Sequence, residues 1–401
     1  MTVPARLSPI PSAAPEIGPP PDGGRAFPQG SVMKKILLTG VTGFLGQELL
    51  RLLCAEGEEV TCLVRPGKTA DARERVTNAL TGSSLDPGRV AVVEGDLALP
   101  RFGLDAAGWD RLTAETTTII HCAADVRFNR PLEKIRRINV EGVGHVLDLA
   151  AACRQSNPDF ERLDYVSTAY VAGRRTGVAT EDELEHSAGF KNTYEQTKHE
   201  AEKLVRQRRG ELPVAIYRPS IVLGASGNGV AKPNNVIYPM LKVFSRWRLA
   251  AAPANAATRL DLVPVDYVAR SLIAISKTPA AVGGCFHLAA GEGRDLSLGR
   301  FIRIMGEVFH RRIIILPPWV HRKIIRPLLK TFRREFYERS TTTFRAFEPY
   351  IFDENPRFST VNARAALAGT GIEMPDTETF LRACLTYAVN TRFGKAPPTS
   401  P

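Results

Sequence analysis

Long apolar runs are missing from this sequence of 401 residues. No stretch approaches the roughly 18–20 apolar residues that a membrane-spanning helix needs. The opening stretch, MTVPARLSPIPSAAPEIGPPP, also lacks the apolar core of a secretory signal, because prolines interrupt it. We expect residues 1–32 to form a disordered Pro/Gly-rich tail and residues 391–401 a flexible one.

Cysteine is scarce, and the six cysteines are scattered, with no CxxC pair and no histidine cluster. This spacing argues against a zinc site and against a secreted disulfide framework. We therefore predict no metal, buried thiols that act as small hydrophobes, and a cytoplasmic location.

Nucleic-acid motifs are also missing, although the net charge is +11. A basic balance suits nucleic acids, anionic membrane surfaces or anionic small ligands. Because neither zinc-finger spacing nor an aromatic RNA-binding signature accompanies the charge, we expect no nucleic-acid partner.

Short β-branched runs, in contrast, alternate with helical patterns from residue 34 to about residue 225. KKILLTG, EEVTCLVR, RVAVVEGD, TTTIIHCAA, LDYVSTAYV and LPVAIYRPSIVLG read as strands, and several are apolar throughout. The alternation predicts an α/β fold, a Rossmann doubly wound parallel sheet over residues 33–225 that returns at 258–290. Residues 226–257 and 291–390 are expected to form a smaller, mostly helical substrate domain.

The segment TGVTGFLG, residues 39–46, follows the first strand and opens a helix. Gly40 suits a tight turn, Gly43 a close approach to a pyrophosphate, and Gly46 helix packing on the sheet. Free N–H groups at the helix start would hold the anion, so we add Thr42, Phe44 and Leu45 to the cofactor contacts. The alternative is that the glycines serve turn geometry alone.

The spacing G-x-x-G-x-x-G resembles that of extended short-chain dehydrogenases/reductases, over about residues 34–290. Where an NAD-binding fold has an acidic residue after its second strand, this sequence has Arg65. A guanidinium there suits a ribose 2′-phosphate, and Arg73 and Arg75 follow closely, so we predict NADPH. The alternative is a solvated arginine at a strand end.

Tyr194 and Lys198 lie four residues apart in NTYEQTKHEAEKLV, which puts both on one helix face. We expect the ammonium to lower the pKa of the phenol, so that Tyr194 exchanges a proton with a carbonyl oxygen. Tyr165 and Tyr170 are poorer candidates because neither has a lysine four residues on, and we give His121 no chemical role.

The family resemblance implies further contacts. Thr168 of VSTAY would hold the same oxygen as Tyr194, with Ser167 as the substitute if the register is off by one. Small residues after the fourth strand would let the cofactor lie against the backbone. The implied cofactor contacts are Asp96, Leu97, Ala123, Ala124, Pro219, Ser220 and Ile221.

Several segments, among them HCAADVRFN and TRLDLVPVDYVA, are similar to the thioester reductase and fatty acyl-CoA reductase branch. This resemblance implies reduction of a CoA- or carrier-bound acyl thioester to an aldehyde, or further to an alcohol. Two alternatives stay open: a sugar-nucleotide epimerase, dehydratase or 3β-hydroxysteroid-type dehydrogenase, and a catalytically silent NADPH-binding protein. Acyl chain length and oligomeric state stay undetermined.

Residues 321–340 combine apolar side chains at helical steps with interspersed lysines and arginines. Such a helix could lie on an anionic membrane or receive an acidic carrier protein. We favour the alternative, a helix packed on its own domain with a solvated basic face, and Pro327 further weakens the case for one unbroken helix.

Overall fold

A computed structural model of the chain describes residues 34–67, 71–80, 90–128, 130–231, 241, 251–325, 327 and 347–393. Lys34–Pro401 forms one compact unit. The expected tail at 1–32, most of the tail at 391–401 and most of the basic segment 321–340 lie outside the described residues. The division into a Rossmann and a substrate domain stays a prediction.

A seven-stranded sheet with the order β12-β7-β5-β4-β1-β2-β3 forms the centre of this unit, and every neighbouring pair is parallel. β5 and β7 are buried at every residue, as strands covered on both faces should be. The predicted doubly wound α/β fold is thereby confirmed. The strands are β1 (Lys35–Thr39), β2 (Glu59–Val64), β3 (Val90–Glu94), β4 (Thr118–His121), β5 (Arg162–Val166), β7 (Val214–Pro219) and β12 (Cys285–Leu288).

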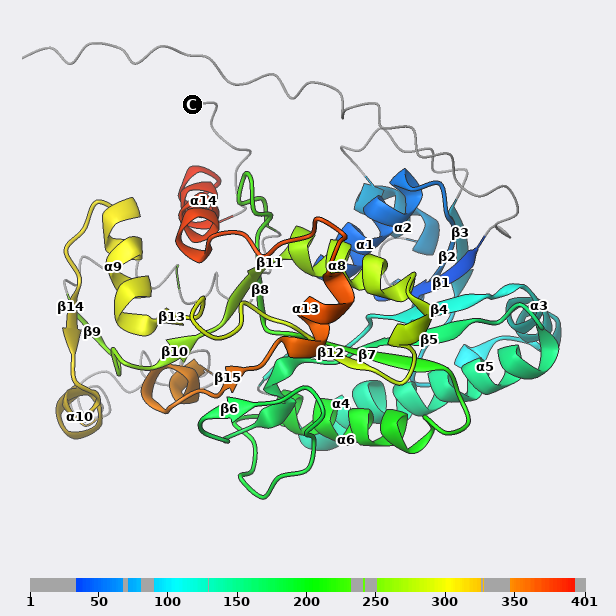
Figure 1. The fold of residues 1–401 in the computed structure, drawn as a ribbon, viewed down its shortest axis with the longest axis horizontal. Coiled ribbons are helices and arrows are strands. Elements are labelled where there is room, and N and C mark those ends of the chain that lie inside the picture. The colour runs from blue at the N-terminus through cyan, green and yellow to red at the C-terminus, as the bar shows by residue number, and fades with distance from the viewer. Residues whose placement is uncertain are drawn as a thin grey trace, which may run out of the picture. The chain divides into compact units, whose positions relative to one another are not determined.

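Helices cover both faces of the sheet, with α1, α2 and α8 on one side and α3, α5 and α6 on the other (Figure 1). Each face has its own cluster of buried apolar side chains. The helices are α1 (Phe44–Ala55), α2 (Ala72–Leu80), α3 (Ala106–Glu115), α4 (Leu132–Arg136), α5 (Gly142–Ser156), α6 (Thr193–Gln207), α8 (Val265–Ser276), α9 (Leu298–Val308), α10 (Pro318–Val320), α13 (Val361–Leu367) and α14 (Thr377–Asn390).

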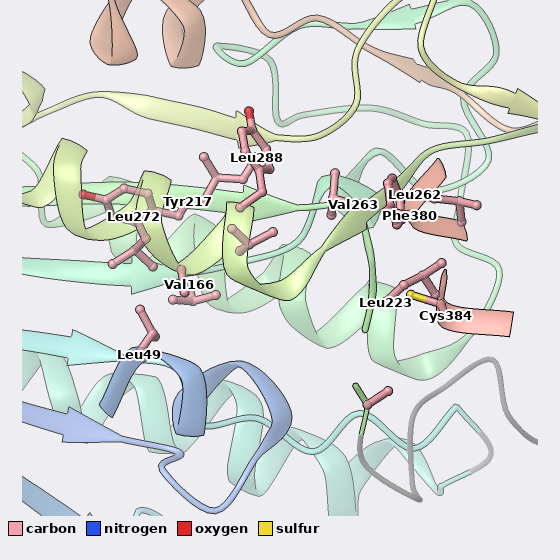
Figure 2. Packing of buried hydrophobic residues seen from close by; sticks show 14 of the residues in the cluster. Leu49, Val166, Tyr217, Leu223, Leu262, Val263, Leu272, Leu288, Phe380 and Cys384 are labelled. Carbon is pink, nitrogen blue, oxygen red and sulfur yellow. The ribbon is translucent and has the colours of Figure 1, made fainter. Parts of the chain in front are cut away.

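The apolar layer between the sheet and the helices α1 and α8 fixes the first strand–turn–helix unit. Leu49 of α1 and Leu272 of α8 are fully buried and point toward Tyr217 and Val166 of the sheet (Figure 2). Truncating a buried leucine of this kind typically costs about 2–5 kcal/mol. The helix that follows the glycine turn is therefore anchored to the sheet by this apolar layer.

Outside the central sheet, the described residues form four two-stranded sheets, each of which pairs an earlier segment with a later one. β8 (Ile221–Leu223) pairs with β11 (Leu262–Pro264), and β6 (Val178–Ala179) pairs with β15 (Arg357–Phe358). β9 (Ala251–Pro253) pairs with β14 (Ile314–Leu316), and β10 (Arg259–Leu260) with β13 (Leu296–Ser297). Within the described ranges, no helix is both long and apolar enough to cross a membrane.

The strand order reverses between β1 and β4, which lie side by side. The helix after β1 and the helices after β4 cover opposite faces of the sheet (Figure 1). In a doubly wound sheet, the carboxyl ends of the strands at this reversal form the ligand-binding crevice. The fold thus places the turn after β1 and the segment after β4 at the expected site.

Candidate active site

Glycine is required at one position in the turn between β1 and α1 and at one position in the first turn of α1. Gly40 has a φ of +79°, and a Cβ atom on it would lie 2.6 Å from the backbone nitrogen of Ala123. A Cβ atom on Gly46 would lie 2.2 Å from the carbonyl oxygen of Gly40. The turn is therefore as tight as the sequence predicts, and it lies against the segment after β4.

Helix α1 begins at Phe44, and its N-cap is Gly43, which has no side chain with which to cap the helix. The first turn carries no acidic residue. A helix start of this kind attracts anions, because its N–H groups and the helix dipole both favour negative charge. The turn with Thr42, Phe44 and Leu45 therefore fits a pyrophosphate.

Two arginines lie where β2 ends and α2 begins. Arg65 directly follows β2 and is exposed, and Arg75 of α2 donates a 2.6 Å hydrogen bond to the Arg65 carbonyl oxygen. Arg73 is exposed on the same helix. The arginines thus gather at the carboxyl edge of the sheet, beside the glycine turn.

The ends of β3 and β4 bring four more predicted residues to this edge. Asp96 and Leu97 follow β3, and the Asp96 carboxylate accepts a 3.0 Å hydrogen bond from the Ala98 N–H. Ala123 and Ala124 follow β4, and the Ala123 N–H donates to Thr39 Oγ1 at 3.2 Å. Both pairs therefore lie at the carboxyl ends of their strands, and their contact with a cofactor stays a prediction.

The last predicted trio lies at the end of β7, where Pro219 ends the strand and Ser220 follows it. The Ser220 N–H donates to the Leu288 carbonyl oxygen at 3.2 Å. Ile221 opens β8 and pairs with Leu262 of β11. The Pro219 carbonyl oxygen accepts a hydrogen bond from Thr168 Oγ1 at 3.3 Å, which links this segment to the end of β5.

Helix α6 positions Tyr194 in its first turn. Asn192 caps the helix, because its side chain accepts a 2.9 Å hydrogen bond from the Glu195 N–H. Burial raises the pKa of Tyr194, and the neighbouring Thr168 hydroxyl offsets part of that rise. Tyr194 is therefore a protonated phenol at neutral pH, suited to donating a proton to an oxygen.

Lys198 lies one turn further along α6 and is buried. Its ammonium donates 2.8 Å hydrogen bonds to Tyr165 Oη and to the Val166 carbonyl oxygen. Burial lowers the pKa of Lys198 to about 8. The structure thus differs from the expectation for the tyrosine: Lys198 bonds to β5, and burial raises rather than lowers the pKa of Tyr194.

Ser167, the predicted substitute for Thr168, is engaged elsewhere. Its hydroxyl donates a 2.7 Å hydrogen bond to Glu202, and that carboxylate forms a buried ion pair with Arg218. Thr168 is therefore the hydroxyl that stands beside Tyr194. The sequence could not separate the two serine/threonine positions because Glu202 is distant along the chain.

Two residues at the site have no role in the prediction from sequence. The Tyr165 hydroxyl is an acceptor for Lys198, and the His121 ring stacks on the Tyr165 ring at a centroid distance of 6.0 Å. His121 Nδ1 is hydrogen bonded to Thr39 Oγ1 at 2.8 Å, and burial lowers its pKa to about 3. Within the described ranges, no group of His, Cys, Asp or Glu side chains is arranged to hold a metal.

A glycine turn at the reversal of a parallel sheet, beside a Tyr–Lys pair, defines a class of nicotinamide-dependent oxidoreductases, the extended short-chain dehydrogenases/reductases. Comparison with known proteins agrees with this class. The male sterility protein family matches residues 38–272, more than half of the chain. The chain therefore belongs to that family, and the residues of the glycine turn fit its nicotinamide cofactor.

Several relatives are much longer proteins that this chain matches over one part. The chain is 33% identical over 283 residues to a linear gramicidin synthase from Brevibacillus parabrevis, covering 66% of this chain and 5% of the relative. It is 32% identical to the L-2-aminoadipate reductase large subunit of Penicillium chrysogenum, covering 62% of this chain and 19% of the relative. The crystal structure of the terminal R domain from the myxalamid PKS-NRPS biosynthetic pathway superimposes with a TM-score of 0.78 at 29% identity, covering 93% of this chain and 95% of that one.

Proposed function

We propose that this chain reduces an acyl thioester to an aldehyde with NADPH as the hydride donor. One observation carries the proposal: the Thr168 hydroxyl lies beside the protonated Tyr194 phenol, and Lys198 follows one helical turn later and bonds to the end of β5. The same edge of the sheet has a glycine turn that fits a pyrophosphate. The relatives support it, because one of them is named as an aminoadipate reductase and the similar crystal structure is that of an R domain from a PKS-NRPS pathway.

The catalytic residues act on the carbonyl oxygen of the thioester. The nicotinamide supplies a hydride to the carbonyl carbon when it is bound. The Thr168 hydroxyl turns away from the Pro219 carbonyl oxygen, so that Thr168 and Tyr194 both donate hydrogen bonds to the substrate oxygen as negative charge develops there. Tyr194 then transfers its proton to that oxygen. When the C–S bond breaks and the thiolate leaves, the Tyr194 phenolate takes that proton back and the aldehyde carbonyl forms.

Selection of NADPH over NADH belongs to the arginines after β2. Arg65 is exposed at the strand end, and the bond from Arg75 to the Arg65 backbone carbonyl oxygen holds the Arg75 guanidinium at the same strand end. A 2′-phosphate would pair with guanidinium groups at this place, whereas a free 2′-hydroxyl gains little from them.

The substrate is a thioester on a carrier protein or on CoA. The chain spans 5% of the gramicidin synthase and 19% of the aminoadipate reductase, so their complete activities belong to larger assemblies. We favour a carrier-bound acyl group, because the similar crystal structure is that of a terminal R domain from a PKS-NRPS pathway.

A cytoplasmic location agrees with the six cysteines, none of which is in a disulfide.

The test measures NADPH consumption with the same acyl group on a carrier protein and on CoA, with the product identified. Tyr194→Phe should lower turnover by about two to four orders of magnitude, because it removes the proton donor, while NADPH binding remains. Tyr387→Phe, in the half-buried C-terminal helix α14, is the matched control and should keep full activity. Tight NADPH binding without reduction of either thioester would contradict the proposed function.

A further inference from the structure

Tyr165 is a buried polar residue that the proposed chemistry does not use. It lies in β5, it is 1% exposed, and its ring is stacked on His121 with an angle of 12° between the rings. A tyrosine in such a place packs as a hydrophobe, but its hydroxyl needs hydrogen-bond partners. Those partners determine what Tyr165 contributes.

The first partner is the Lys198 ammonium. Its nitrogen lies 2.8 Å from Tyr165 Oη and 4.4 Å from the centroid of the Tyr165 ring, so the hydroxyl accepts and the ring adds a cation–π contact. The Val166 carbonyl oxygen, also 2.8 Å away, is a second acceptor. An ammonium has three N–H donors. Two of those of Lys198 bond to Tyr165 and Val166 of β5, which leaves the third N–H for the site.

The second neighbour is Ser167, two residues further along the chain. A carboxylate only accepts, so the Ser167 hydroxyl donates its proton to Glu202 at 2.7 Å. Burial raises the pKa of Tyr165 well above its ordinary value, and the Ser167 side chain offsets part of that rise. Arg218 and Arg206 anchor Glu202 from two sides.

We propose that Tyr165 is a positioning residue that fixes the Lys198 ammonium at the site. The role rests on the proposed function in one respect, since it treats Lys198 as part of the catalytic set. Tyr165 itself touches neither substrate nor cofactor in this role. It acts through the lysine.

The charges around Lys198 determine the direction of the expected effect. Burial lowers the pKa of Lys198, whereas Cys122, at the end of β4, and Glu202, on α6 itself, raise it. His121, Tyr165 and Tyr194 complete the titratable surroundings, and burial keeps all three neutral. Removing an acceptor from the ammonium destabilises its charged form, so the pKa of Lys198 should fall further.

The experiment compares Tyr165→Phe with Tyr217→Phe in the full chain. Tyr217 lies on the neighbouring strand β7, is equally buried, and donates a 2.9 Å hydrogen bond to Asp164. Tyr217→Phe therefore also removes a buried tyrosine hydrogen bond, but one that does not involve Lys198. Carbon-13 labelling of lysine follows the titration of Lys198 directly, with Lys198→Met to assign its signal. The pH profile of thioester reduction is the second measurement.

Tyr165→Phe should lower the titration midpoint of Lys198 by about one pH unit, the size expected for one hydrogen bond to a charged group. The alkaline limb of the activity profile should move in the same direction, whereas Tyr217→Phe should leave both unchanged. If Tyr165→Phe does not fold, 3-fluorotyrosine at position 165 keeps the ring and the hydroxyl but weakens the oxygen as an acceptor, so it should produce a smaller shift in the same direction.

An unchanged Lys198 titration in Tyr165→Phe, or an equal shift in Tyr217→Phe, would overturn the proposal. The Lys198 titration distinguishes a failure of the positioning role from a failure of the proposed function. If the midpoint moves as expected but no thioester is reduced by the unmodified protein, the positioning role stands and the proposed reaction is wrong.

Discussion

Arg65 is the residue at which the choice between the two nicotinamide cofactors can be tested. It is exposed directly after β2, where its charge would meet a 2′-phosphate. Arg65→Glu replaces attraction by repulsion, so kcat/KM for NADPH should fall about 10- to 100-fold while that for NADH stays level or rises. Steady-state kinetics with both cofactors give the ratio.

Arg111→Glu is the control for Arg65→Glu, because Arg111 is exposed on α3, a helix on the opposite face of the sheet from α2. It changes the net charge by the same amount and should leave the cofactor ratio unaltered. An unchanged ratio in Arg65→Glu would mean that the arginines after β2 do not select the cofactor.

For single residues, the sequence predicts contacts between residues that are close along one element. It does not predict contacts between residues that the fold brings together from different elements. Tyr194 and Lys198 could be paired because four residues make one helical turn. Tyr165 has no lysine four residues on, which made it a poor candidate, yet it contacts Lys198 from a neighbouring strand. The roles of Ser167 and Thr168 were likewise separated by Glu202, whose place beside β5 depends on how α6 packs.

Among the elements, the first turn of α1, which packs against the preceding glycine turn, should tolerate no side chain at Gly46. A Cβ atom there would lie 2.2 Å from the Gly40 carbonyl oxygen, so α1 and the turn would have to separate. Gly46→Ala should weaken NADPH binding at least about 10-fold and lower the melting temperature. Titration calorimetry and thermal unfolding measure the two effects.

Gly144→Ala provides the matched control for Gly46→Ala in another helix. Gly144 lies inside α5, where a Cβ atom would meet nothing within 4 Å. Alanine in a helix interior is favoured over glycine by about 0.5–1 kcal/mol, so this variant should be slightly more stable and bind NADPH normally. Equal losses of NADPH affinity and melting temperature in both variants would show that the close approach of α1 and the turn at Gly46 does not cause the effect.

Helix α6 is also held from the C-terminal part of the chain. The Tyr350 hydroxyl donates to the buried Glu195 carboxylate and accepts a 2.7 Å hydrogen bond from the Asn192 amide. Glu195 follows Tyr194 directly, and Phe128 lies between the rings of Tyr194 and Tyr350, 5.8 Å from one and 5.9 Å from the other. The segment at 347–352 thus braces the first turn of the helix that carries the proposed proton donor.

The folding stability that is lost when this brace is removed should depend on pH. Burial raises the pKa of Glu195, and the Tyr350 hydrogen bond offsets part of that rise. Since the folded state favours protonated Glu195, ionisation of this group reduces folding stability as the pH rises. Tyr350→Phe removes the donor to the anion, so it should destabilise by about 1–3 kcal/mol near pH 8 and by less near pH 4.

Denaturant unfolding at both pH values measures the Tyr350→Phe effect, with Tyr387→Phe as the comparison. A loss of the same size at both pH values would mean that the Asn192 contact, which does not titrate, accounts for all of it.

The elements themselves were largely predictable, because the β-branched runs are short and bounded by helical patterns. The position of residues 347–352 was not, since their contacts with α6 join segments that are about 155 residues apart in the chain. Periodicity reports which face of an element is apolar, but it does not report which distant element covers that face.

For the whole molecule, the net charge of +11 should act on any anionic substrate before contact. A field of this kind raises the association rate of an oppositely charged partner, and salt screens it beyond about 10 Å at 0.1 M. An acyl group on CoA or on an acidic carrier protein carries such charge. The same acyl group on the small neutral thiol N-acetylcysteamine does not.

Raising the salt from about 0.05 to 0.5 M should therefore lower kcat/KM for a carrier-bound thioester about 10-fold, while kcat changes little. The N-acetylcysteamine thioester should show no such decline, because its encounter with the chain is not steered by charge. Stopped-flow measurement of NADPH oxidation with both thioesters makes the comparison at equal NADPH saturation. A parallel decline for the neutral thioester would place the salt effect on the protein or on cofactor binding, and it would remove electrostatic steering as the reason for the basic composition.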